Sequence, residues 1–452
     1  MQPSILFRII VLYFVFRLSS SQVKSIYKQD SLFKEAIDYF YSTKHFETIS
    51  PKECGSVKLD KDLTKLKGHK FLIDSNEKYF PQFMNRDVDP EFPKVFIWKR
   101  EDYTLESIAE AVRSLIDENL HLYGAMVIRG IGIQNGDEDL NGSCNNSTNK
   151  DTSTTSFSFS TLLRSLGYQL TKYVGGVTVR KEADGQPMIY PASEEDPEVC
   201  MDLHQDNVYW ATPPAKLFFY YEKVAHKGGL NPLLDMRGYE KALTQLEDNI
   251  GVKIIDQFES KGVRYENFYP DGRNPNSRFL SWQKSFQTED RQEVEKNLHS
   301  GNFQYEWAKE YHSNGTEYQH LRKWNVMSPF KTHPVTGERL WVNMIVANHA
   351  SYFHDHPNYP ELVGVPFSDQ KEKKASQIGI NLNNEYPFNV KYGDGSTIPY
   401  EIIQKLRGLA WEKSRGFKAQ DGDLLIVDNY VAQHGRLGYK PPRKFWIGIS
   451  LN

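Results

Sequence analysis

Cysteine is scarce in this chain, and neither sign of charge is in clear excess. The 452 residues include three cysteines, and 55 Lys and Arg residues stand against 58 Asp and Glu residues, for a net charge of −3. Three cysteines form at most one disulfide within the chain, so a disulfide framework is excluded and an apolar core has to hold the fold. Hydrophobic residues at 39% and aromatic residues at 13% are ample for such a core. The missing basic excess argues against a nucleic-acid partner.

Long hydrophobic runs and glycine-rich nucleotide-binding loops are also missing. No G-x-G-x-x-G or Walker-type loop occurs in the sequence. The apolar run at residues 9–16 is much shorter than the ~20 residues that span a bilayer, so we expect no stable membrane anchor. This run follows Arg8 and precedes the small residues Ser19 to Ser21, a pattern typical of a secretory signal peptide. We therefore predict a signal peptide at residues 1–21, with a buried N-terminal strand or helix as the alternative.

Four N-x-[ST] glycosylation acceptors agree with a secretory route. They lie at Asn141, Asn145, Asn146 and Asn314. A chain of this length contains a few such acceptors by chance, so they support the route without establishing it. The sequence predicts a glycoprotein of the secretory pathway, and a cytoplasmic protein is the alternative.

The periodicity of apolar residues predicts a β-rich core with helices on its surface. Amphipathic helical stripes are expected at 104–120, 239–250 and 400–411, and strands at 124–132, 216–224, 340–346, 423–428 and 444–451. We interpret residues 22–95 as an N-terminal extension that packs on the core, and residues 96–452 as one main domain. Residues 134–156 are almost purely Asn, Asp, Ser, Thr and Gly, which is typical of a surface insertion.

The segment 201–210 carries a pair of candidate metal ligands. His204 and Asp206 are two residues apart, so on an extended segment both side chains point to the same side. An imidazole and a carboxylate so placed can take adjacent positions on a metal, and a second imidazole would complete a face that suits non-haem Fe(II). Such a pair alone is a weak signal, because His45 and Glu47 have the same spacing by chance.

The C-terminal segment supplies candidates for the remaining roles. A turn at residues 421–422 begins a buried strand, after which we expect a loop to present His434 as the third ligand. Arg443 follows two prolines at the start of the final strand, where its guanidinium fork can pair with a carboxylate. Taken singly, His434 could be an ordinary loop histidine and Arg443 an ordinary surface charge.

Together these motifs resemble the Fe(II)/2-oxoglutarate-dependent dioxygenases of the taurine dioxygenase superfamily, in the clavaminate-synthase-like branch. The similarity covers most of residues 100–452. The matching motifs are Arg129-Gly130, the H-x-D at 204–206, Lys216-Leu-Phe-Phe-Tyr-Tyr, Gly228-Gly229-Leu-Asn-Pro-Leu-Leu-Asp-Met-Arg, His333-Pro-Val-Thr-Gly-Glu, Tyr392-Gly-Asp-Gly-Ser-Thr-Ile-Pro, and Asp428-Asn429 through His434 to Arg443. The resemblance implies a mainly β fold with flanking helices around a double-stranded β-helix (jelly-roll) core.

The resemblance also implies a ligand set and a reaction class. His204, Asp206 and His434 would bind Fe(II), and Arg443 would hold the distal carboxylate of 2-oxoglutarate, which is consumed with O₂ to give succinate and CO₂. Asn231 stands where the family commonly has Thr, and its amide would assist that carboxylate. Halogenating relatives have no carboxylate at the position of Asp206, so its presence implies hydroxylation, desaturation or a related oxidation such as cyclisation.

The substrate implied is a small molecule that resembles an amino acid. Tyr190, Glu194, Glu195 and Asn207 are candidates for the mouth of the site, with a solvated acidic loop as the alternative for 194–198. Arg436 is expected either to contact substrate or to brace its loop. Two other functions stay open: a catalytically silent jelly-roll binding protein, and a zinc hydrolase that uses the same three ligands.

Overall fold

The computed structural model describes residues 45–55, 91–99, 103–133, 157–173, 180–193, 195–275, 280–311, 315–353 and 386–452. The predicted signal peptide, the polar insertion at 134–156 and the four glycosylation acceptors lie outside the described residues, so they stay predictions. No helix in these ranges combines the length and the apolar character needed to cross a bilayer.

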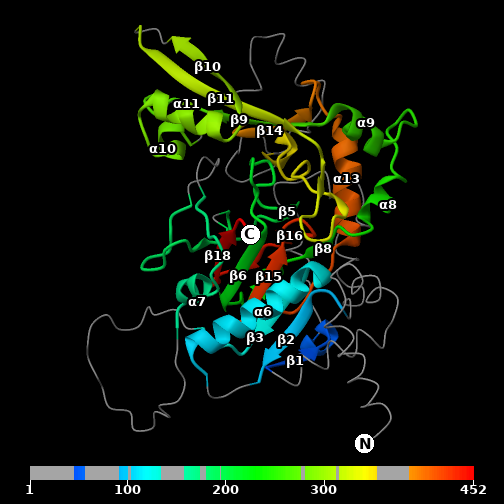
Figure 1. Cartoon of the computed structure of the whole chain (residues 1–452). Coiled ribbons are helices and arrows are strands. Elements are labelled where there is room, and N and C mark those ends of the chain that lie inside the picture. The colour runs from blue at the N-terminus through cyan, green and yellow to red at the C-terminus, as the bar shows by residue number, and fades with distance from the viewer. Residues whose placement is uncertain are drawn as a thin grey trace, which may run out of the picture.

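A seven-stranded sheet lies at the centre of the molecule (Figure 1). The strands follow the order β1-β2-β3-β15-β6-β18-β4, and only the β2–β3 pair is parallel. Their bounds are β1 (Phe46–Ile49), β2 (Lys94–Trp98), β3 (Ala125–Arg129), β15 (Leu424–Asp428), β6 (Lys216–Lys223), β18 (Lys444–Ser450) and β4 (Tyr190–Pro191). Both faces of the sheet are covered, which explains why its central strands are near-continuous hydrophobic runs. β1, part of the predicted N-terminal extension, forms one edge.

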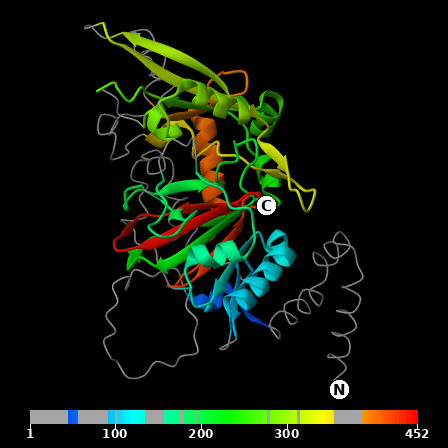
Figure 2. The same cartoon turned by 60° about the vertical axis from the view of Figure 1, so that its left-hand side comes forward.

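Two helices cover one face of this sheet (Figure 2). α6 (Leu105–Tyr123) begins after Thr104, whose side chain accepts a hydrogen bond from the Ser107 N–H, and ends at Gly124 with a positive φ of 74°. α7 (Phe159–Ser165) lies beside it. The apolar stripe of α6 packs on the sheet residues that point to the same side, which are Phe96, Met126, Ile128, Phe218, Leu424 and Ile426.

A three-stranded sheet covers the opposite face. It consists of β5 (Met201–His204), β16 (Ala432–Arg436) and β8 (Leu233–Asp235), with β16 in the middle. Leu233 and Ala432 belong to the same apolar cluster as Phe219, Leu425 and Ile447 of the large sheet, so the two sheets pack face to face. A short pair, β7 (Lys227–Gly228) and β17 (Tyr439–Lys440), adjoins them.

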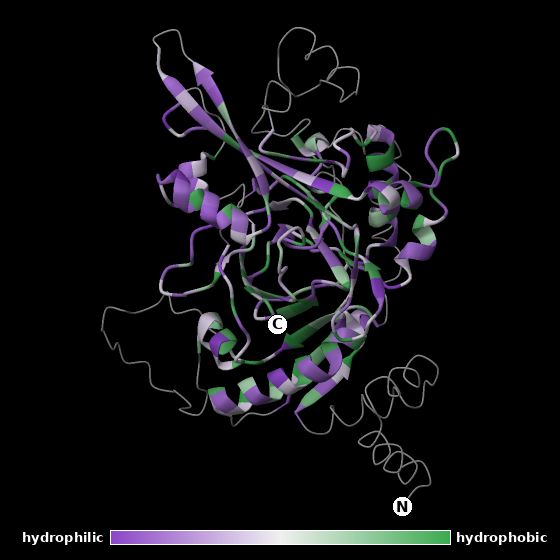
Figure 3. Ribbon diagram, turned by 45° about the horizontal axis from the view of Figure 1, so that its top comes forward, coloured by the Kyte–Doolittle hydropathy of each residue, from purple (hydrophilic) through white to green (hydrophobic). Residues whose placement is uncertain are grey.

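A four-stranded sheet forms the upper part of the view in Figure 1. Its order is β10 (Gln304–Tyr311), β11 (Glu317–Met327), β9 (Val263–Tyr269) and β14 (Phe388–Tyr392). The projecting β10–β11 hairpin is largely hydrophilic, whereas the strands at the centre of the molecule are hydrophobic (Figure 3). The remaining elements are α8 (Tyr239–Leu243), α9 (Ile254–Lys261), α10 (Trp282–Phe286), α11 (Arg291–Ser300), α13 (Tyr400–Lys413), β12 (Phe330–Thr332), β13 (Arg339–Trp341) and two short 3-10 helices (Pro51–Cys54 and Ala350–Phe353).

The described part of the chain is mainly β with helices on its sheets, as predicted. The expected helices at 104–120 and 400–411 and the strands at 124–132, 216–224, 423–428 and 444–451 are confirmed, with small shifts at their ends. The helix expected at 239–250 is wrong beyond Leu243, because the Asp248 carboxylate accepts backbone N–H bonds from Ile250 and Val252 and forms a turn. The strand expected at 340–346 ends at Trp341, since the Asn343 side chain accepts the N–H of Ile345 in a turn.

Candidate metal centre

Three buried side chains, His204, Asp206 and His434, meet between the sheets. One nitrogen or oxygen from each lies within 4.8 Å of the others. The Nε2 atoms of His204 and His434 are 3.4 and 3.9 Å from Oδ1 of Asp206. None of the three residues is more than 7% exposed. The fold thus brings together the three residues that the sequence predicts as ligands, although their segments are far apart along the chain.

Strand register places the two histidines. His204 and His434 are directly opposite each other on the antiparallel strands β5 and β16, and their rings are 4.4 Å apart. Side chains of opposite residues lie on the same face of a sheet, so both imidazoles point toward one location. Asp206 follows two residues after β5 ends. The expectation that a loop presents His434 is wrong, because this residue lies within β16.

A hydrogen bond on the side of the ring away from Asp206 fixes the orientation of His204. Its Nδ1 atom is 2.7 Å from the backbone oxygen of Asp202, which requires a hydrogen on Nδ1 and leaves Nε2 facing Asp206. The Asp202 carboxylate accepts hydrogen bonds from Arg407 Nε at 2.8 Å and from Trp411 Nε1 at 2.9 Å, both on α13. All of these groups are buried. Helix α13 therefore anchors the strand that carries His204.

Asp206 is held at both its backbone and its carboxylate. Its N–H donates to Oδ1 of Asn429 at 2.8 Å, and Nδ2 of Asn429 donates back to its carbonyl at 2.8 Å. The Tyr173 hydroxyl donates to Oδ2 of Asp206 at 2.8 Å. Because Tyr173 occupies Oδ2, only Oδ1 faces the two imidazoles. The carboxylate is thereby arranged to offer one oxygen to a metal.

The protonation states of the site suit a cation. Burial and the neighbouring His204 lower the pKa of His434 to about 3. Burial alone would raise the pKa of Asp206, but the neighbouring His204, His434 and Arg180 hold that pKa well below its ordinary value. At neutral pH, His434 is neutral and Asp206 ionised, which are the forms that bind metals. Two imidazoles and one carboxylate oxygen form the donor set that fits non-haem Fe(II).

Arg443 lies next to this centre and is positioned for a carboxylate. Its Nη2 donates to Oδ1 of Asn231 at 2.7 Å, and its guanidinium lies 4.2 Å from the ring centroid of Phe445. Burial lowers the pKa of Arg443 to about 10. Among the described residues, no carboxylate forms an ion pair with Arg443. A buried guanidinium in this state fits the distal carboxylate of 2-oxoglutarate.

Stacked rings and one amide link Arg443 to the three candidate ligands. Phe445 stacks on Phe219 at 5.3 Å, and Phe219 lies 4.9 Å from the His434 ring. Nδ2 of Asn231 donates to the carbonyl of Gly435, the residue after His434. Asn231 therefore holds Arg443 in place relative to β16. That its amide also contacts 2-oxoglutarate stays a prediction.

Of the other residues predicted at the site, Arg436 braces its surroundings. Its guanidinium donates to Oγ of Ser193 and to the backbone oxygens of residues 195, 196 and 199, so it holds the acidic loop. The Tyr190 hydroxyl donates to Glu182 at 3.3 Å rather than to any candidate ligand. Glu194 lies outside the described residues.

Sequence reasoning missed several residues that support the site. These residues lie in different segments of the chain: Tyr173, Arg180, Asp202, Asn429 and Arg407. No local motif marks Tyr173 or Arg180. Asp202 carried a usable signal, because it is an acidic residue two positions before His204 on a strand that is otherwise buried. Asn429 belongs to the Asp428-Asn429 motif that resembles the family, but the sequence alone predicts no role for its side chain.

Comparison with known proteins agrees with this geometry. The model of the taurine catabolism dioxygenase TauD, TfdA family matches residues 91–447. Among curated proteins, the dapdiamide synthesis protein DdaC of Enterobacter agglomerans is 27% identical over 335 residues, covering 74% of this chain and 84% of that protein. A clavaminate synthase-like protein of Arabidopsis thaliana is 23% identical over 334 residues, covering 73% of this chain and 82% of that protein.

Solved structures align only loosely. PvcB, described as an Fe, alpha-ketoglutarate dependent oxygenase from an isonitrile synthetic pathway, aligns with a TM-score of 0.37 at 11% identity, covering 88% of this chain and 94% of that chain. The assignment therefore rests on the family model, which spans well over half of the residues. The chain belongs to the taurine catabolism dioxygenase TauD, TfdA family and is a dioxygenase that uses Fe(II), 2-oxoglutarate and O₂.

Proposed function

We propose that this dioxygenase oxidises a small, amino-acid-like metabolite by hydroxylation, desaturation or cyclisation, at iron held by His204, Asp206 and His434. The observation that carries the proposal is the convergence of these buried side chains beside Arg443. The names of the two curated relatives refer to dapdiamide synthesis and to clavaminate synthase, which supports a small metabolite as substrate. We also propose that the two packed sheets form a jelly-roll core.

The roles of the protein groups follow from their geometry. Iron, 2-oxoglutarate and O₂ supply the oxidising chemistry, with succinate and CO₂ as coproducts. The two imidazoles and the single free oxygen of Asp206 would hold the iron, a donor set that suits a metal that also binds a cosubstrate and O₂. Arg443 binds the far end of 2-oxoglutarate, and the rings of Phe219 and Phe445 keep water from this ion pair.

An anaerobic titration followed by a turnover assay tests the function. The protein is loaded with Fe(II) and titrated with 2-oxoglutarate, and the charge-transfer absorption band of the chelate is recorded. O₂ is then admitted and succinate is measured, first alone and then with a panel of amino-acid-like metabolites. We expect the band, slow uncoupled succinate release, and faster release with a substrate.

The two alternative functions predict other results. A silent binding protein would release no succinate, and a zinc hydrolase would show neither the band nor a need for 2-oxoglutarate. His226→Ala serves as the control variant, because this exposed histidine lies outside the site. Secretion also stays a proposal, and sequencing the N-terminus of the mature protein tests it: an intact Met1 would contradict it.

A further inference from the structure

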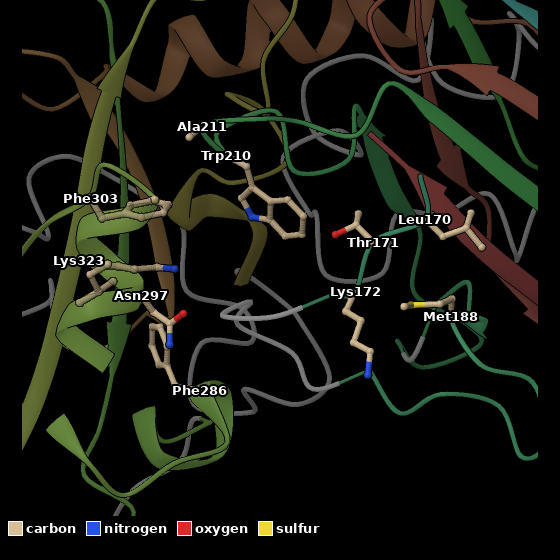
Figure 4. A pocket seen from close by; sticks show the side chains of 12 residues that line it. Leu170, Thr171, Lys172, Met188, Trp210, Ala211, Phe286, Asn297, Phe303 and Lys323 are labelled. Carbon is tan, nitrogen blue, oxygen red and sulfur yellow. The ribbon is translucent and has the colours of Figure 1, made fainter. Parts of the chain in front are cut away.

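A cavity and a buried histidine are two features of the described residues that the proposed function does not use. The cavity has a volume of about 480 Å³ and lies between the central body and the four-stranded sheet, with Lys172 on one side and Lys323 on the other (Figure 4). None of the residues that line it is a candidate iron ligand. The histidine is His333, and a series of hydrogen bonds connects it to Asp206.

His333 is buried, and both nitrogens of its ring have hydrogen-bond partners. The residue is only 2% exposed. Its Nδ1 atom accepts the backbone N–H groups of Val335 at 3.2 Å and of Thr336 at 3.0 Å, in the turn between β12 and β13. Because Nδ1 accepts these two bonds, the hydrogen of the neutral ring lies on Nε2. Nε2 therefore donates to Oδ2 of Asp428, which is 2.9 Å away.

Asp428 is the last residue of β15, and its buried carboxylate shapes the turn that follows. Oδ1 of Asp428 accepts the N–H groups of Tyr430 at 3.0 Å and of Val431 at 3.3 Å. His333 supplies a third donor, to the other carboxylate oxygen. A buried carboxylate is costly unless it is hydrogen-bonded. We therefore expect the turn to loosen when the donor from His333 is lost.

The turn after β15 holds Asp206 through Asn429. The Asn429 side chain is fully buried, accepts the N–H of Asp206 and donates to the carbonyl of Asp206, each at 2.8 Å. Its Nδ2 atom also donates to the carbonyl of Pro214 at 2.9 Å, so the amide joins the segment after β5 to the segment before β6. Beyond Val431 the chain enters β16, which carries His434. The backbone of Asp206 is thus positioned by a residue of this turn.

We propose that His333 is a positioning residue for the iron site and acts through Asp428 and Asn429 on Asp206. Its ring nitrogens face the β12–β13 turn and Asp428, so it is a support for the ligand and not a ligand itself. Ligands that are held in place before the metal arrives lose less freedom on binding, so such a support raises metal affinity. This inference rests on the proposed function, because it takes Asp206 as an iron ligand.

Two substitutions separate the roles of the two ring nitrogens. Asparagine has an oxygen near the place of Nδ1, so His333→Asn keeps an acceptor for the β12–β13 turn but loses the donor to Asp428. Glutamine has a nitrogen near the place of Nε2, so His333→Gln keeps that donor and loses the acceptor. Anaerobic titration of the full-length protein with Fe(II) measures the Kd. We expect His333→Asn to weaken Fe(II) binding about tenfold, and His333→Gln to weaken it less than about threefold.

Further variants test the route and keep the result independent of how well His333→Asn folds. Asp428→Asn breaks the same hydrogen bond from the other side, because an amide nitrogen then faces Nε2, and should cause a similar loss. In a double-mutant cycle, Asn429→Ala should cause a larger loss, to which His333→Asn adds little if it acts through Asn429. Thr336→Val is the control, because it removes only the oxygen that accepts the Glu338 N–H in the β12–β13 turn, and should leave the Kd unchanged.

Unchanged Fe(II) binding in both His333→Asn and Asp428→Asn, a larger loss in His333→Gln than in His333→Asn, an equal loss in Thr336→Val, or losses that add in the cycle would each overturn the inference. The 2-oxoglutarate absorption band separates it from the function on which it rests. His333→Asn keeps all three candidate ligands, so the band should still form at saturating Fe(II). If the unaltered protein forms the band and the support variants bind Fe(II) equally well, only the role of His333 fails. If the unaltered protein binds no Fe(II) and forms no band, the proposed function itself fails.

Discussion

The three-stranded sheet that carries His204 and His434 and the four-stranded sheet that carries Lys323 both direct buried polar groups toward the interior, but they hold them differently. Around His204 and Asp206, side chains and backbone form a connected set of hydrogen bonds that reaches Arg407 and Tyr173. The Lys323 amine lies 4.5 Å from the ring centroid of Phe303 and 5.5 Å from those of Phe286 and Tyr269. The three-stranded sheet fixes the positions of the candidate metal ligands, whereas the four-stranded sheet places the Lys323 amine among aromatic rings.

This difference predicts that the two regions respond differently to substitution. A metal needs donors in a rigid arrangement, and hydrogen-bonded neighbours provide the rigidity. A buried amine is instead costly to keep charged, so its protonation changes within an accessible pH range. Variants in the first sheet should therefore change metal binding, whereas a variant of Lys323 should change how the stability of the protein depends on pH.

Removing a proposed ligand should have the largest effect. His204→Ala deletes one of the two imidazoles that face Oδ1 of Asp206. We expect Fe(II) affinity to fall by more than the roughly 100-fold that loss of an outer partner costs, and succinate release to disappear. Metal titration of the purified protein measures the affinity directly. Unchanged Fe(II) binding in His204→Ala, with His226→Ala as the reference, would show that the ligand assignment is wrong.

Loss of Arg443 should weaken cosubstrate binding and leave the metal in place. Arg443→Gln removes a charge-assisted pair worth about 1.5–3 kcal/mol, which corresponds to roughly 10- to 150-fold in the Kd of 2-oxoglutarate. An anaerobic absorption titration measures this Kd. Lys444→Gln is the matched control, because it removes the exposed charge of the next residue along the chain. Equal Kd values for the two variants would contradict the role of Arg443.

A smaller effect on Fe(II) affinity is expected from a residue that does not bind the metal but holds the Asp206 carboxylate by a hydrogen bond. Tyr173→Phe removes the hydroxyl that occupies Oδ2 of Asp206. We expect Fe(II) affinity to fall about tenfold, since the carboxylate is no longer restricted to one oxygen. Tyr190→Phe is the control, because that ring packs against Tyr173 at 5.1 Å while its hydroxyl donates to Glu182. A similar loss in both variants would indicate a packing effect rather than control of the ligand.

The sequence predicted the candidate ligands because their signals are local. His204 and Asp206 form a spaced pair, and His434 lies near a buried strand and an arginine in a short segment. Tyr173 escaped prediction because its role depends on a contact with Asp206, 33 residues away along the chain. Lys323 lies in a strand of mixed composition, where a lysine ordinarily faces water. Only the packing of β11 against the turn at Tyr209 shows that its face is buried.

The buried amine of Lys323 should make the free energy of unfolding depend on pH. Lys323 has a pKa of about 7 when folded, against its ordinary value near 10.5 when unfolded. Below pH 7, both states are protonated, and the folded state carries the full cost of burying the charge. Between pH 7 and 10.5 the unfolded state binds the proton and the folded state does not, so the free energy of unfolding rises with pH.

Lys323→Met lacks this contribution, so its stability relative to the unaltered protein should be greatest near pH 6 and should decline as the pH rises toward 10. The decline cannot exceed about 1.4 kcal/mol per pH unit, the limit for a difference of one proton. Urea unfolding at a series of pH values measures it, and taking the difference between two proteins cancels every other titrating group. Lys172→Met is the control variant, because it removes an exposed amine instead of a buried one. If the difference for Lys323→Met does not change with pH, Lys323 is charged in the folded protein throughout this range. Its charge would then be balanced by neighbouring groups, as the charges in the three-stranded sheet are.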